Sequence, residues 1–169
     1  MNFELRMYGL VPYNISPIQC GIQYGHAVIE YGLLFFNDKD YQNWAKNHKT
    51  FIILNGGTSN HSINRYHEGE FVGSMELHLK TLQENKIKVA SFFEPNLNDM
   101  LSGICFLVDE RVFNIIKYPD FVFGNYQSTI FNPECSSISE EKAWAEWIES
   151  IGGDRNLFLR KFLRGFKLA

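Results

Sequence analysis

The sequence has 169 residues, of which 45% are hydrophobic and 21% are charged, and its formal net charge is -3 at pH 7. This length favours one domain of ordinary size, and the composition excludes a disordered or fibrous chain. The small negative charge argues against a surface that coats nucleic acid or adsorbs to a membrane, so any basic patch must be local. Three cysteines, Cys20, Cys105 and Cys135, lack metal-binding spacing, which favours free thiols in a reducing compartment.

Signals for targeting, cofactors and metals are weak. The N-terminus has no basic segment followed by an apolar stretch, so we expect a soluble, cytoplasmic protein with no membrane partner. No phosphate-binding loop, dinucleotide fingerprint or G-x-S-x-G elbow is present. His61, His67 and His78 have loose spacing and no cysteine partners, which is a poor zinc signature. We therefore expect no metal and no cofactor.

Patterns of apolar and turn-forming residues predict alternating strands and helices. Four runs are typical of strands: residues 5–13, 51–54, 87–93 and 102–108. Three stretches have helical features: residues 16–33, 38–49 and 74–85, the last capped by Ser74. Their order predicts a mixed α/β sheet with helices on its faces.

The first of these helices has a clear start. Ser16 precedes Pro17, and Gln19 follows at the spacing of a capping box. Gly21 and Gly25, one turn apart, would let the helix approach the sheet closely. The residues that we expect to face inward recur at helical intervals: Ile18, Ile22, Ile29 and Leu33.

Polar residues form a second stripe on the same helix, and they are the first candidate site. Gln19, Gln23, His26 and Glu30 fall on one helical face. Beside the open N–H groups of a helix N-terminus, amide and imidazole groups could hold a phosphate or a carbonyl. The competing interpretation is structural: Gln19 closes the capping box, and His26 packs against the sheet.

The second candidate site is the turn before the last strand. Residues 94–99, Glu-Pro-Asn-Leu-Asn-Asp, are followed closely by Ser102. Ligands of α/β sheets gather at loops beyond strand ends, so Glu94, Asn98, Asp99 and Ser102 are candidates for binding or chemistry. The alternative is a well-capped turn in which Asn and Asp bond to the backbone.

The C-terminal part is predicted to be helical. Ser137 and Glu140 form a capping-box pair ahead of a helix that contains Trp144 and Trp147. A final helix begins at Asp154. Five residues make it basic: Arg155, Arg160, Lys161, Arg164 and Lys167. A charge row of this kind is more often solvated surface than a site for RNA or an acidic protein. Residues 58–73 read as a long loop, and loops of this length often serve a function.

Two motifs resemble those of the peptidyl-tRNA hydrolase type 2 fold, in particular phage and bacterial hypothetical proteins of that group. Residues 15–27, ISPIQCGIQYGHA, are similar to its pattern L-S-P-G-Q-Q-A-x-Q-x-x-H-A. Residues 93–104, FEPNLNDMLSGI, are similar to its F-x-E-P-D-L-x-N-x-L-T-A-I. The resemblance covers about residues 5–110. It implies a mixed four-stranded sheet flanked by helices (residues 1–118), often a homodimer, which acts on the ester between a peptide and tRNA. We expect residues 119–169 to form a helical C-terminal extension that packs on this domain or projects from it.

The resemblance also assigns roles, with departures. The family's early lysine falls on Gln19, so a cationic contact to phosphate or oxyanion is absent. The family's catalytic aspartate falls near Glu94, and its following threonine near Asn98. We expect Glu94 to orient water, and Gln19, Asn98 and Ser102 to hold the carbonyl or phosphate, with Gln23, His26 and Asp99 as further binding residues.

Three readings of function stay open at this point. The first is hydrolysis of peptidyl-tRNA or a related nucleotide ester. The second is a catalytically degenerate module that binds a nucleotide, an RNA or a protein partner through the same cleft. In the third, the C-terminal helices dock a dimer or a protein partner, and its alternative is that they only extend the core. The family resemblance and the first two functions depend on the first helix and the turn at Glu94 facing each other across a shared pocket.

Overall fold

A computed structural model describes residues 3–59, 67–69, 73–124 and 139–169. It has a four-stranded mixed sheet in the order β2-β1-β4-β3, which confirms the predicted fold class. β1 (Leu5–Pro12) pairs parallel with β2 (Thr50–Gly57) and antiparallel with β4 (Met100–Asp109). β3 (Val89–Glu94) is antiparallel to β4 at one edge. Pairing carries β2 through Asn55, Gly56 and Gly57, which were expected to end it.

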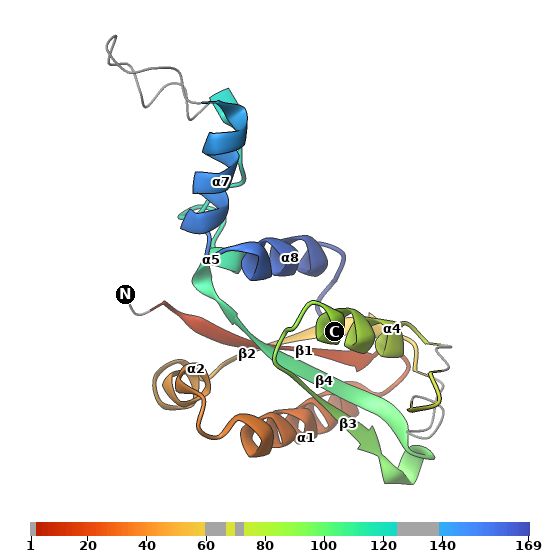
Figure 1. Ribbon diagram of the computed structural model, residues 1–169. Coiled ribbons are helices and arrows are strands. Elements are labelled where there is room, and N and C mark those ends of the chain that lie inside the picture. Colours follow the sequence, from red (N-terminus) through yellow and green to blue (C-terminus); the bar gives the residue numbers. More distant parts are fainter. Residues whose placement is uncertain (1–2, 60–66, 70–72, 125–138) are drawn as a thin grey trace, which may run out of the picture.

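Helices cover both faces of the sheet (Figure 1). On one face lie α1 (Pro17–Phe35), α2 (Lys39–Asn43) and the π-helical turn η1 (Trp44–His48). On the other lie α4 (Ser74–Glu84) and α8 (Asp154–Leu163). The short α5 (Glu110–Phe113) follows β4, and α7 (Glu140–Ser150) extends away from the sheet.

Strand alternation divides the core into two layers. Successive side chains of a strand point to opposite faces, so Met7 and Val11 pack under α1 whereas Tyr8 and Leu10 pack under α4 and α8. The central strand β4 contributes to both layers and is buried along almost its whole length. Such burial is why its sequence is nearly all apolar rather than alternating.

The capping box at the start of α1 is confirmed, but the predicted inward face of this helix is wrong. The stripe expected to pack inward is exposed: Ile18, Ile22, Ile29 and Leu33. The face that contacts the sheet is instead built from a different set of residues: Gln23, Tyr24, Ala27 and Tyr31. The Tyr24 hydroxyl donates to the Met7 carbonyl oxygen at 2.7 Å, which satisfies the polar end of this buried ring.

The glycines that allow close approach belong to the sheet. A Cβ on Gly9 would lie 2.1 Å from the Tyr24 ring, and one on Gly103 would lie 2.6 Å from the Gln23 carbonyl oxygen. Gly21 and Gly25 of α1 have no heavy atom within 4 Å of such a Cβ, so their predicted role was wrong. Bare backbone on β1 and β4 therefore lets α1 lie directly on the sheet.

Two predicted caps also differ from the structure. The N-cap of α4 is Gly73 rather than Ser74, whose hydroxyl donates to the Gly56 carbonyl and ties the helix to β2. α7 is capped by Ser139, whose Oγ accepts the Lys142 N–H, and not by Ser137, which lies outside the described residues.

The last residues of the sequence complete one sheet edge. Leu168 forms an antiparallel bridge with Leu54 of β2. The Asn55 N–H donates to the Lys167 carbonyl, and the Ala169 N–H donates to the Ile53 carbonyl. Residues 167–169 thereby occupy polar groups that an edge strand would otherwise leave open.

Candidate functional site

Polar residues of α1 lie along one flank, and each has a different environment. Gln19 is exposed, and its Oε1 accepts the Ser16 N–H at 3.1 Å, so its side chain closes the capping box. Gln23, one turn later, is buried and faces the end of β3. The His26 ring stacks on Phe92 of β3 with a centroid distance of 4.4 Å. The contacts that the structural interpretation predicted, the capping box for Gln19 and packing against the sheet for His26, are therefore both present.

Gln23 joins the two sequence motifs. Its Nε2 donates to Glu94 Oε2 at 2.8 Å, and its Oε1 accepts from Ser102 Oγ, also at 2.8 Å. All three side chains are buried, with Glu94 9% exposed and Ser102 fully buried. α1, β3 and β4 each supply one of them. The first helix and the turn at Glu94 thus face each other, as the sequence reading required.

A β-bulge explains why Ser102 reaches this cluster. The register of β3 against β4 shifts so that Phe92 pairs with Gly103 and Phe93 with Leu101, which leaves Ser102 as the extra residue. Leu101 packs in the α4 layer, so strict alternation would place Ser102 and Gly103 on opposite faces. Both instead face α1. Bulges commonly re-aim a side chain in this way beside functional sites.

Glu94 is held as a carboxylate by its partners. It ends β3 and caps the short 3-10 turn η2 (Pro95–Leu97), where its Oε1 accepts the Asn96 N–H at 3.2 Å. The hydrogen bond from Gln23 is the main cause that lowers the pKa of Glu94 below its ordinary value, and the Asn96 N–H and the nearby His26 act in the same direction. The carboxylate is therefore ionised at neutral pH.

The cluster of Gln23, Glu94 and Ser102 presents hydrogen-bond acceptors, but it does not present a strong base. An anionic carboxylate with spare lone pairs can bind an N–H or O–H group or position a water molecule. Its lowered pKa makes it a weak proton acceptor. The amide nitrogen of Gln23 is hydrogen-bonded to Glu94 and its amide oxygen to Ser102, so Gln23 positions these two side chains.

Two predicted site residues lie next to the cluster without joining it. Asn98 and Asp99 both have left-handed backbone conformations, with φ of 58° and 53°. They form the reversal between η2 and β4. Among the described residues, no hydrogen bond connects either side chain to Gln23, Glu94 or Ser102. Their binding roles stay predictions.

The three histidines considered as metal ligands are separated or outside the described part. His61 lies outside it, His67 is exposed, and His78 packs edge-on against Phe162 and Phe166. Burial lowers the pKa of His78 below its ordinary value. Across residues 3–59, 67–69, 73–124 and 139–169, no three His, Cys, Asp or Glu side chains gather as a metal site would require.

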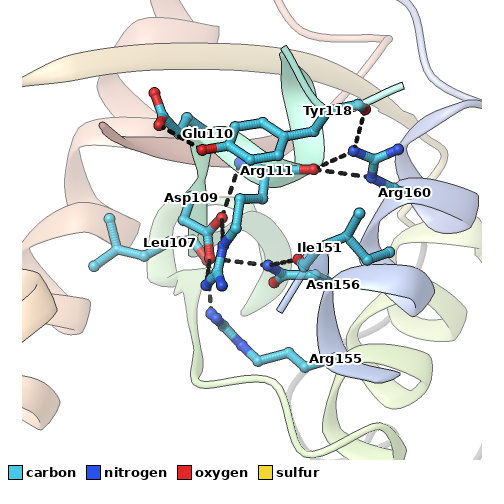
Figure 2. A network of polar contacts seen from close by, with 9 residues as sticks. All are labelled: Leu107, Asp109, Glu110, Arg111, Tyr118, Ile151, Arg155, Asn156 and Arg160. Atoms are coloured by element: carbon cyan, nitrogen blue, oxygen red, sulfur yellow. Dashed lines mark hydrogen bonds and ion pairs between the residues drawn. The ribbon is translucent and has the colours of Figure 1, made fainter. Parts of the chain in front are cut away.

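The predicted solvated basic face of α8 is only partly solvated. Arg160 is buried and donates to the carbonyl oxygens of Arg111 and Tyr118, while Arg155 donates to the Leu107 carbonyl (Figure 2). Arg164 remains exposed, as does Lys161. Sequence periodicity could not identify the buried cation, because its partners are distant in the sequence: the carbonyl oxygens of Arg111 and Tyr118 and the carboxylate of Asp120. This shrinks the basic surface available to RNA.

The same network shows that α8 extends the core. Asn156 donates to Asp109 Oδ2 and to the Ile151 carbonyl (Figure 2). Leu159 is fully buried in the layer that contains Phe106 and Val108. These contacts favour the interpretation that α8 extends the core over the interpretation that it serves only to dock a partner. The role of α7 as a docking element stays a prediction.

Neither comparison with known proteins found a relative: no family model matches the sequence, and no curated protein matches it. In the part of the chain that the structure describes, no helix has the length and apolarity needed to cross a membrane.

The sequence analysis missed three contributors to the site: the bulge at Ser102, the ring of Phe92 beneath His26, and the Asn96 N–H. The capped turn after Glu94 was the only signal for any of them.

Proposed function

We propose that this chain is a peptidyl-tRNA hydrolase-like protein that acts on tRNA esters or related nucleotide esters at the Gln23, Glu94 and Ser102 cluster. The observation that carries the proposal is the hydrogen bond between Gln23 and Glu94. It brings together, 71 residues apart in the sequence, the two motifs on which the family resemblance rests.

In this proposal Glu94 positions the attacking water. Its ionised carboxylate accepts a proton-bearing group without leaving its place, because Gln23 and the Asn96 N–H hold both oxygens. Gln19 and Asn98, both exposed near the cluster, are the side chains proposed to hold the ester carbonyl or a phosphate. No metal is needed for attack on an activated ester.

A second function, a binding module without catalysis, is favoured by one specific observation. The pKa of Glu94 is lowered, whereas a general base works best with a pKa near the operating pH. Together with glutamine at the position of the family's lysine, this suits recognition of a nucleotide or an RNA end more than turnover.

The deciding experiment compares the wild type with Glu94→Gln on peptidyl-tRNA, following release of the peptide. If the protein hydrolyses peptidyl-tRNA at this site, we expect turnover to fall roughly a hundredfold in the variant. Glu84→Gln is the matched control, because Glu84 is an exposed glutamate on the opposite face of the sheet. Turnover that survives Glu94→Gln would contradict the assigned site.

Binding of uncharged tRNA and of mononucleotides tests the module. We expect saturable binding that Gln19→Ala weakens more than Ser16→Ala does, because both changes break the capping box but only one removes the proposed contact. A wild type that neither turns over peptidyl-tRNA nor binds tRNA or nucleotide contradicts both functions.

A further inference from the structure

A cleft lies between α4, α8 and the end of β2, on the face of the sheet opposite to the cluster of Gln23, Glu94 and Ser102. Its volume is about 420 Å³, within the range of roughly 300–1,000 Å³ that is typical of small-molecule sites. Residues 74–81 supply one wall and residues 162–166 the other. Figure 1 shows the chain running from α8 toward α4. The second wall belongs to the C-terminal extension, which lies outside the stretch that resembles the hydrolase family.

The position of the cleft in the sheet favours a ligand. β1 and β2 are parallel neighbours, but the chain leaves β1 for α1 on one face and leaves β2 for α4 on the other. In open α/β sheets, ligands bind outside the carboxyl ends of the strands at such a change of face. The cleft lies at this point, because the residues that end β2 line it: Asn55, Gly56 and Gly57.

The walls of the cleft are suited to a flat ring. The rings of His78, Phe162 and Phe166 border it, and the His78 centroid lies 4.8 Å from that of Phe166 and 5.8 Å from that of Phe162. Gly165 and the two glycines that end β2 add bare backbone. A planar ligand can stack on aromatic rings or meet their edges, and bare backbone lets it approach closely.

Two polar groups of the cleft have unused hydrogen-bonding capacity. Asn55 Oδ1 accepts the Gly57 N–H at 2.9 Å, but within the described residues no hydrogen bond engages the Asn55 amide nitrogen or the His78 ring. Burial lowers the pKa of His78, so at neutral pH its ring is mostly uncharged and offers one donor and one acceptor. The hydroxyls of Ser74 and Thr81 differ, since they already donate to backbone carbonyls. Among the described residues that line the cleft, none is Lys, Arg, Asp or Glu.

We propose that this cleft is a second binding site, which takes a neutral, planar nitrogen heterocycle such as a purine base. The aromatic walls hold the ring, Asn55 donates to one of its acceptors, and His78 completes a hydrogen bond at its edge. A hydrocarbon ring would leave both polar groups without partners. An anion would find no cation on the described walls. The site does not depend on the ester chemistry proposed at Glu94, because the two lie on opposite faces of the sheet.

Isothermal titration calorimetry of the full chain with adenine tests the site. We expect saturable binding of one adenine per chain, with a Kd below about 1 mM. Indole has a fused ring of the same shape but no ring nitrogen that accepts a hydrogen bond, and it should bind roughly fivefold more weakly. Glu94→Gln should bind adenine as the wild type does, which separates this site from the proposed hydrolase site.

Two variants locate the ligand, with circular dichroism as the check on folding. Gly165→Leu should weaken adenine binding about tenfold or more by filling the cleft. The fold has room for it, because a Cβ at Gly165 meets nothing closer than the Phe162 carbonyl oxygen at 4.0 Å. Gly25→Leu adds the same side chain on α1, outside the cleft, and is the matched control. His78→Phe keeps an aromatic ring and should weaken adenine binding roughly fivefold without weakening indole.

Four outcomes overturn the proposal. The first is the absence of saturable binding at about 5 mM adenine. The second is binding that His78→Phe and a folded Gly165→Leu both leave unchanged. The third is binding that is lost in Glu94→Gln, which would assign adenine to the other face of the sheet. The fourth is tighter binding of indole than of adenine, because the cleft would then suit an aromatic side chain of a protein partner.

Discussion

Asp109 is the residue whose replacement tests the link between β4 and the C-terminal helices most directly. Its side chain is 7% exposed and accepts four hydrogen bonds. Three come from Arg111, through the backbone N–H, Nε and Nη2, and one comes from Asn156 (Figure 2). Asp109→Asn keeps the shape of the side chain but replaces one acceptor oxygen with an NH₂ donor.

In this variant, two of the four donor groups face the new NH₂ group, which cannot accept a hydrogen bond. If the remaining oxygen keeps the Arg111 N–H and Nε, the losses are the bonds from Arg111 Nη2 and Asn156. Hydrogen bonds to charged groups contribute about 1.5–3 kcal/mol each, so the loss of two of them is expected to cost at least about 3 kcal/mol of stability. For a chain of this size that corresponds to a fall in Tm of roughly 6–12 °C.

Thermal and urea unfolding followed by circular dichroism measure this effect. Glu84→Gln, which breaks only the exposed pair with Lys80, is the control and should cost about 0.5 kcal/mol or less. A loss for Asp109→Asn no larger than that of the control would refute the reasoning.

The pH dependence has a definite sign. Burial would raise the pKa of Asp109, but hydrogen bonds from Arg111 and Asn156 outweigh it and hold the pKa below its ordinary value of 3.8. A carboxyl group with a lowered pKa stabilises the fold above its unfolded pKa and loses this contribution as the pH falls through the folded value. The stability difference between wild type and Asp109→Asn should be constant near neutral pH and shrink below about pH 4.

Three further changes probe the site and the core. Gly103→Ala should destabilise the fold by roughly 2 kcal/mol in urea unfolding, because its Cβ meets the α1 backbone, whereas Gly21→Ala, with open space, should stabilise it by about 0.5–1 kcal/mol; equal effects would contradict the close approach. Ser102→Ala should cost about 1–3 kcal/mol in the same assay by leaving the Gln23 amide oxygen buried without its donor, and an unchanged midpoint would remove Ser102 from the cluster. Cys105 should resist a thiol-specific reagent at pH 8 until the protein unfolds, because it is buried and burial raises its pKa; rapid labelling of a Cys20→Ser, Cys135→Ser variant would contradict this.

Local signals predicted the elements well because each rests on neighbours in sequence. The capping box of Ser16 and Gln19 forms both of its hydrogen bonds, and the buried β4 was visible as an apolar run. The orientation of α1 was not predictable in this way, since aliphatic residues were assumed to be inside. Two tyrosines and a glutamine take that place, because Gly9 and Gly103 leave room for a ring and a backbone.

The candidate site was predictable in part. Glu94, Gln23 and Ser102 were all named from the sequence, and one hydrogen-bonded cluster contains them. The bulge that turns Ser102 toward α1 depends on the pairing of β3 with β4, and no single segment encodes it. The burial of Arg160 was unpredictable for a similar reason, since its hydrogen-bond acceptors come from residues 111, 118 and 120.

The bridge between Leu54 and Leu168 has a consequence for synthesis of the chain. The outer edge of β2 is complete only after residues 167–169 have left the ribosome, although β2 itself is made more than a hundred residues earlier. Until then Ile53 and Asn55 present open backbone groups, and an uncovered edge strand is a template for pairing with other nascent chains. Chaperone dependence during translation should therefore concentrate on this edge.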